Sequence, residues 1–163
     1  MKRIIYAVFA ICFIGIIGCG NDAQKEAKER REKKMAEKKI EKASVVPASE
    51  RVDLDNKGIG PITSIQLEAI SEEMAAKGKE SFKAKCSACH KVSKKFIGPS
   101  PKGVMERRSP EWVMNMMLNP TGMLEKDPLA KELMIEFNGA PMADQNLTEE
   151  EAREILEYFR TLN

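Results

Sequence analysis

Cys86-Ser87-Ala88-Cys89-His90 is the stretch that decides the interpretation of this chain. Two cysteines three positions apart, followed at once by a histidine, form the attachment signature of a c-type haem. Each thiol adds across one haem vinyl group, and the two intervening residues set the span between the thiols. His90 is then placed under the iron as an axial ligand. We therefore predict one covalent haem c held through Cys86 and Cys89, with His90 bound to its iron.

Other interpretations of these residues explain less. A structural zinc site takes four ligands, whereas only Cys86, Cys89 and His90 cluster here. The other two cysteines, Cys12 and Cys19, lie in an apolar N-terminal segment. A thioredoxin-like redox pair would accompany a strand–helix–strand pattern, which the sequence lacks. A structural disulfide between Cys86 and Cys89 would leave the adjacent histidine unexplained.

Residues 1–18 are predicted to be a targeting segment. Lys2 and Arg3 precede an apolar run that extends to Gly18, as in secretory signals, and the run is shorter than the roughly 20 residues that span a bilayer. Gly18 followed by Cys19 resembles the lipobox of bacterial lipoproteins, in which that cysteine is acylated. We expect an exported protein, lipid-anchored through Cys19 at the periplasmic face of a bacterial membrane. An ordinary signal peptide and an uncleaved anchor remain alternatives.

Residues 19–60 are predicted to be a charged tether. Its first half is nearly all lysine, arginine, glutamate and alanine, with too few larger apolar residues to build a core. It is either partly helical or disordered. The whole chain has 27 basic and 25 acidic residues, so removal of Lys2 and Arg3 makes the formal charge zero. This balance argues against a nucleic-acid-binding protein, which would carry a basic excess.

Residues 61–163 are predicted to be one all-α domain, because no alternating apolar and polar run is long enough for a sheet. One helix is expected over residues 66–85, with an apolar stripe at spacing four. Three more helices are expected to begin at capping residues followed by proline or by a capping-box glutamate. The stripe is formed by Ile70, Met74, Gly78 and Phe82, and the three capping residues are Ser109, Asp127 and Thr148.

From residue 65 to 162 the chain resembles class I monohaem cytochromes c. Four features in the family's order carry the resemblance: Gly78-x-x-x-Phe82 before the haem motif, Gly98-Pro99 after it, Pro141-Met142 in a loop, and a C-terminal helix containing Ile155–Phe159. The resemblance implies that the first and last helices cross around a covalent haem, with Gly78 and Phe82 against Ile155 and Tyr158. It also implies that the Pro99 carbonyl accepts from His90 Nδ1, which leaves Nε2 for iron.

The sixth ligand to iron is expected to be methionine sulfur, because His90 is the only histidine. Met142 follows Pro141 in a loop just before the last helix, where a rigid turn can aim a side chain. The resemblance points to the same residue. Met123 or a vacant position remains an alternative, and the other methionines are better explained as core residues. Trp112 is expected either beside the haem or in the core away from it.

These features predict an electron carrier rather than an enzyme. The expected route runs from a quinol-oxidising complex to a terminal reductase or oxidase, with nitrous-oxide reductase as the first candidate, and we expect a monomer. Five lysines near the haem motif predict either a basic docking ring or an ordinary solvated face: Lys83, Lys85, Lys91, Lys94 and Lys95. A sensor or peroxidase with an open sixth position is the alternative function. A subunit held permanently in a larger complex is a third.

Overall fold

The computed structural model describes residues 28, 30, 31 and 46–162. The predicted targeting segment, Cys19 and most of the charged tether lie outside these residues. The chain divides into two units, residues 1–45 and residues 46–163, of which the second contains the haem motif. None of the described helices is both long and apolar enough to cross a membrane.

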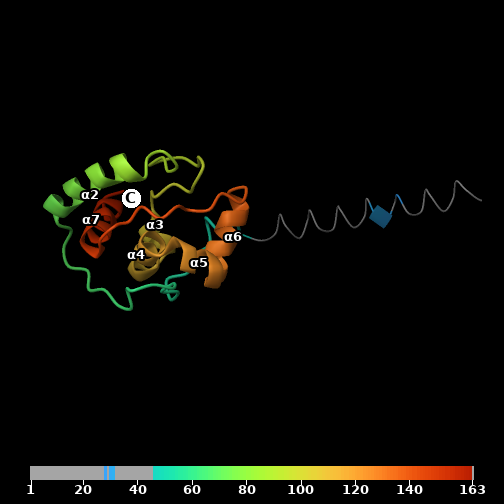
Figure 1. Cartoon of the computed structure of the whole chain (residues 1–163), viewed down its shortest axis with the longest axis horizontal. Coiled ribbons are helices and arrows are strands. Elements are labelled where there is room, and N and C mark those ends of the chain that lie inside the picture. Colours follow the sequence, from blue (N-terminus) through green and yellow to red (C-terminus); the bar gives the residue numbers. More distant parts are fainter. Residues whose placement is uncertain (1–27, 29, 32–45, 163) are drawn as a thin grey trace, which may run out of the picture. The chain divides into compact units, whose positions relative to one another are not determined.

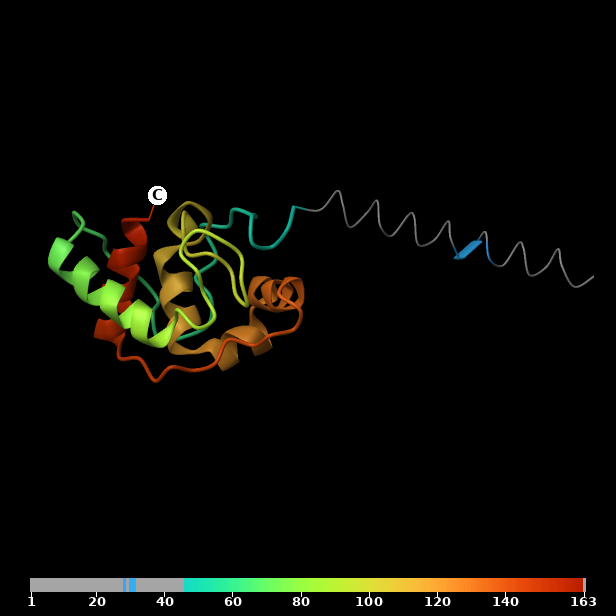
Figure 2. The same cartoon turned by 90° about the horizontal axis from the view of Figure 1, so that it is seen from above.

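Between residues 46 and 162 the chain forms six helices and no β-strand, apart from two isolated bridges, so the all-α prediction is confirmed. α5 and α6 lie on the side of this unit away from α2 and α7 (Figures 1 and 2). The helices are α2 (Glu72–Lys85), α3 (Val104–Arg107), α4 (Pro110–Leu118), α5 (Pro120–Lys126), α6 (Pro128–Glu136) and α7 (Glu149–Arg160).

The crossing of α2 and α7 is the tightest contact of the fold. A Cβ atom at Gly78 would lie 2.0 Å from the backbone oxygen of Glu154 and 2.7 Å from the nitrogen of Ile155. Only glycine permits this approach of two backbones. Beside it the ring of Phe82 lies 5.7 Å from that of Tyr158, centroid to centroid. The crossing implied by the resemblance is therefore present, with the expected partners.

Capping residues set where the helices begin. Thr148 and Glu151 form a capping box at α7, in which each side chain accepts from the other residue's backbone N–H. Ser109 and Asp127 cap α4 and α6, each just before a proline. The prediction for α2 was wrong by six residues: Ser71 caps it by accepting from Met74 N. Ile70 therefore lies outside the helix and is 43% exposed.

A buried carboxylate joins α7 to the start of α2. The side chain of Glu157 is 1% exposed and pairs with Arg153 and Arg160 on its own helix. It also accepts from the backbone N–H of Ser71 at 3.4 Å. Although burial acts to raise it, the hydrogen bonds from the two arginines hold the pKa of Glu157 below its ordinary value of 4.5.

The compact unit begins at Val46, whereas we assigned residues 46–60 to the tether. We call these residues the strap. Ala48 is buried, Asp53 N donates to Arg107 O at 2.9 Å, and Asn56 Nδ2 donates to Asp127 Oδ2 at 2.8 Å. The strap is held mainly by hydrogen bonds to polar groups of the domain. Hydrophobic periodicity does not detect such a segment.

Candidate haem site

α2 ends by presenting the cysteine–histidine motif. Cys86 is the C-cap of the helix, and its N–H donates to Phe82 O. A tight turn follows, in which the N–H groups of Cys89 and His90 both donate to Cys86 O, at 3.1 and 2.9 Å. Cys86 is buried and Cys89 exposed, and both thiols are free. Burial raises the pKa of the Cys86 thiol.

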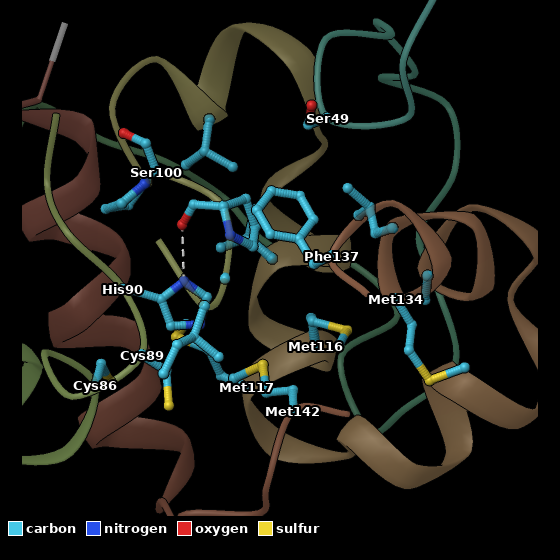
Figure 3. Close-up of a pocket in the computed structure, with 18 of the residues that line it drawn as sticks. Ser49, Cys86, Cys89, His90, Ser100, Met116, Met117, Met134, Phe137 and Met142 are labelled. Atoms are coloured by element: carbon cyan, nitrogen blue, oxygen red, sulfur yellow. Dashed lines mark hydrogen bonds between the residues drawn. The ribbon is translucent and has the colours of Figure 1, made fainter. Parts of the chain in front are cut away.

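The His90 imidazole is fixed by the next loop. Its Nδ1 lies 2.8 Å from Pro99 O, shown as the dashed line in Figure 3. A carbonyl only accepts, so Nδ1 carries the proton and Nε2 keeps a lone pair that can bind a metal. Gly98 closes over the ring, since a Cβ there would lie 2.5 Å from His90 Cε1. The predicted contact between His90 and Pro99 is present.

An apolar cavity opens beside the motif (Figure 3). Phe82, Trp112, Phe137 and Phe159 contribute aromatic walls. Cys86, Cys89 and His90 all lie on its lining, so the three predicted haem-attachment residues converge on one cavity. The cavity therefore offers a largely apolar surface to whatever group occupies it.

Four methionines line this cavity: Met116, Met117, Met134 and Met142. Met142 lies half-buried in the loop between α6 and α7, directly after Pro141. Met123, the alternative ligand, is fully buried elsewhere. Its sulfur accepts from Ile59 N at 2.9 Å, and Met123 is not among the lining residues. The alternative of Met123 as a ligand is therefore not supported.

Trp112 combines the two expectations that the sequence left open. It is a buried core residue whose Nε1 donates to Asp127 Oδ1 at 3.3 Å. It also contributes to the cavity wall. Because its N–H is already bonded to Asp127, it faces the cavity as an apolar surface.

The five lysines of the expected basic ring differ in their surroundings. Lys85 pairs with Glu151 at 2.7 Å, and Lys95 Nζ lies 3.8 Å from Glu136. Lys91 donates to Ser87 O at 2.7 Å. Lys83 and Lys94 are exposed. Carboxylates thus offset part of the positive charge around the motif.

Ser49 and Arg108 are polar cavity residues that the sequence did not predict. Ser49 lies in the segment assigned to the tether, and Arg108 follows the short, unpredicted helix α3; both line the cavity. Nothing in the sequence marked either residue, since Arg108 stands between Arg107 and Ser109 and Ser49 lies in a polar stretch.

The residues present fit a haem better than a bare metal ion. Among residues 28, 30, 31 and 46–162 no group of three or more histidine, cysteine or acidic side chains is placed to hold an ion. Two thiols and one oriented imidazole border an apolar cavity with methionine sulfur on its lining. That donor set is suited to covalent haem with one nitrogen and one sulfur ligand.

Residues 75–163 match the family model described as Cytochrome c. The chain belongs to the cytochrome c family. This cytochrome therefore carries a covalent haem c, and its single Cys-x-x-Cys-His motif makes it a monohaem protein that transfers electrons. No curated protein gives a significant match.

Solved structures of Rhodothermus marinus cytochrome c are similar to this cytochrome. One is 40% identical, covers 71% of this chain and 93% of its own, and superposes with a TM-score of 0.62. An engineered form of that protein is 39% identical, covers 71% and 94% of the two chains, and has a TM-score of 0.61. A further engineered form, bound to a carbene intermediate, is 38% identical over 71% and 94%, with a TM-score of 0.59.

Proposed function

We propose that Cys86 and Cys89 would attach the haem, that His90 and Met142 would ligate its iron, and that the cytochrome carries single electrons. The observation that carries this proposal is the 2.8 Å contact between His90 Nδ1 and Pro99 O. It makes Nδ1 the donor and leaves the Nε2 lone pair free, so the imidazole is a defined metal ligand.

Haem supplies a one-electron iron couple, and the residues of the chain tune it. The Pro99 carbonyl and Gly98 hold the imidazole in one orientation. The aromatic and aliphatic walls surround the site with few polar groups. A methionine opposite histidine favours ferrous iron and gives a comparatively high reduction potential. Met142 suits this role because Pro141 restricts the loop that presents it.

The docking face of this proposal lies at the haem motif. Cys89 is exposed there, and Phe96 and Ile97 are 49% and 48% exposed. Lys83 and Lys94 add positive charge beside them. A small apolar patch with a charged rim suits brief encounters with a redox partner, since such interfaces are small and steered by charge.

The proposed route runs from a quinol-oxidising complex to a terminal reductase or oxidase, with nitrous-oxide reductase the first to test. Cys19, which lies outside the described residues, would carry the lipid anchor that keeps the domain at the periplasmic face of the membrane. Cys19→Ala should move the holoprotein from the membrane fraction to the soluble periplasmic fraction, or block its maturation. Retention of the variant in membranes would indicate an uncleaved anchor instead.

The ligand assignment is tested by absorption spectroscopy. Ferric holoprotein should show the weak charge-transfer band of a methionine–iron bond, and Met142→Ala should abolish it while the haem stays attached. Met134→Ala is the matched control, because Met134 lines the same cavity and should leave the band intact. A band that survives in Met142→Ala rejects Met142. Absence of the band from the wild type would favour the sensor or peroxidase with an open sixth position.

A further inference from the structure

The loop that carries Met142 is held mainly at its two ends. It spans residues 138–147, between the C-cap of α6 and the Thr148 cap of α7. Among the residues that the structure describes, residues 140–147 form hydrogen bonds only with one another or with the end of α6. Met142 and Leu147 are only partly buried against the core. The position of Met142 therefore depends on how firmly the ends of the loop are fixed.

The last turn of α6 sets the direction in which this loop leaves the helix. Gly139 N donates to Met134 O at 2.8 Å, as in a Schellman motif. Asn138 and Gly139 both have positive φ, 61° and 75°, so the chain turns sharply at this point. The buried residues of α6, Leu129 and Ala130, lie in its first turn. Its last turn therefore needs support of another kind.

Glu136 supplies that support by joining three segments of the chain. Ser49 of the strap donates through N and Oγ to the two carboxylate oxygens, at 2.9 and 2.6 Å. Lys95, from the loop after the haem motif, places Nζ 3.8 Å from Glu136 Oε1 and 3.5 Å from Glu136 O. The same Nζ lies 4.3 Å from the centroid of the Phe137 ring. We call these four residues the clasp.

We propose that Glu136 is a positioning residue for Met142, because it ties the last turn of α6 to the strap and to the loop after the haem motif. Ser49, Phe137 and Met142 all line the haem cavity, as Figure 3 shows. A ligand that is already held at the cavity loses less conformational freedom when it binds. A loosened clasp should therefore weaken the binding of Met142. This inference rests on the proposed ligation of the iron by Met142.

The clasp is tested by letting imidazole compete with Met142 in ferric full-length holoprotein. A weaker methionine bond gives imidazole a higher apparent affinity. Glu136→Gln keeps the size of the side chain but removes the charge that Ser49 and Lys95 face. It should raise the apparent affinity about tenfold, the factor expected for the loss of one hydrogen bond to a charged group. Ser49→Ala removes only the hydroxyl donor of the strap and should raise the affinity by a smaller factor.

Glu132→Gln is the matched control. Glu132 lies one turn earlier on α6, and its carboxylate pairs with Arg51 of the strap at 2.6 Å. The two side chains are 47% and 36% exposed, and an exposed ion pair contributes little. The apparent affinity for imidazole should therefore stay within about twofold of the wild type, because such a pair is worth little.

Amide hydrogen exchange of the same holoproteins separates positioning from general destabilisation. In Glu136→Gln, exchange should become faster across residues 134–140, because the cap that ends α6 opens more often. Exchange in α2 and α7 should stay as in the wild type. Faster exchange spread equally over α2 and α7 would show a merely structural role and would overturn the proposal.

The wild type decides which proposal has failed. If it shows the methionine–iron band and Glu136→Gln binds imidazole no more tightly than Glu132→Gln, the positioning role is refuted and the ligation by Met142 stands. If the wild type lacks the band, the ligation by Met142 is refuted, and the positioning role with it. If Glu136→Gln does not accumulate as holoprotein, Ser49→Ala decides by the same comparison with Glu132→Gln.

Discussion

Replacing Gly78 by alanine tests the helix crossing on which the haem site is built. The new Cβ would lie 2.0 Å from Glu154 O, and contacts below 3.0 Å are essentially not tolerated. The obstructing atom is backbone, so no side-chain rotation relieves it. α2 and α7 must therefore separate by about 1 Å, which forfeits a quarter to a half of each dispersion contact across the gap.

The expected cost follows from two opposing effects. Overpacking of this kind destabilises by about 3 kcal/mol at the upper end of its usual range, and the Phe82–Tyr158 and Phe82–Phe159 ring contacts beside it are weakened. Alanine recovers about 1 kcal/mol over glycine through helix propensity. The net loss should be about 2 kcal/mol, which lowers the midpoint of thermal unfolding of a domain this size by roughly 10 °C.

The assay is reversible denaturant unfolding of the holoprotein, followed by far-ultraviolet circular dichroism and by haem absorption. Lys79→Ala is the matched control, because Lys79 is the exposed neighbour of Gly78 on the same helix and its loss should change stability by less than about 0.5 kcal/mol. Gly78→Ala could instead be as stable as the wild type, or more stable by the roughly 1 kcal/mol that alanine gains over glycine in a helix. Either result would refute the close crossing of α2 and α7.

Three further variants probe the site and its supports. Thr148→Ala breaks the α7 capping box and should cost about 1 kcal/mol in unfolding free energy; no loss would show that the cap is dispensable. Gly98→Ala should displace the His90 ring and perturb the low-spin haem spectrum, because its Cβ would lie 2.5 Å from that ring. An unchanged spectrum would show that the backbone at Gly98 moves to accommodate the methyl group. Glu157 has a depressed folded-state pKa, so its stabilising contribution is present above pH 4.5 and is lost as pH falls below that value. Glu157→Gln should therefore be less stable than the wild type at neutral pH and should lose less stability on acidification. Denaturant titrations from pH 7 to 3 would measure this. Equal pH dependence of the unfolding free energy in the variant and the wild type would contradict it.

Most of what positions the haem could be predicted from local signals in the sequence. The motif of Cys86, Cys89 and His90 is a covalent requirement, so its spacing is independent of the rest of the fold. The α7 cap depends on Thr148 and a glutamate three residues later, which is equally local. Gly78 was informative because a glycine on an apolar helical stripe has few explanations other than a close crossing.

The strap and the cation beneath it could not be predicted because their partners are distant in sequence and mostly backbone. Ala48 and Arg51 accept from Arg108 through their carbonyls, and any residue supplies a carbonyl. The start of α2 was predicted too early because Ile70 continues the apolar spacing of the helix. In the structure the Ser71 side chain accepts from the N–H of Met74, and this cap sets the beginning of the helix. The short helices α3 and α5 have too few residues for a periodic signal.

The central claim is that His90 and Met142 would both ligate the iron of one haem. Proton–carbon NMR of the ferrous holoprotein, grown with ε-methyl-labelled methionine, tests it most directly, because the haem ring current shifts the methyl group of a ligating methionine far upfield. The account predicts one such resonance among the methionine methyl groups, and its loss in Met142→Leu. A spectrum without a shifted methyl group, or with one that persists in Met142→Leu, would contradict it.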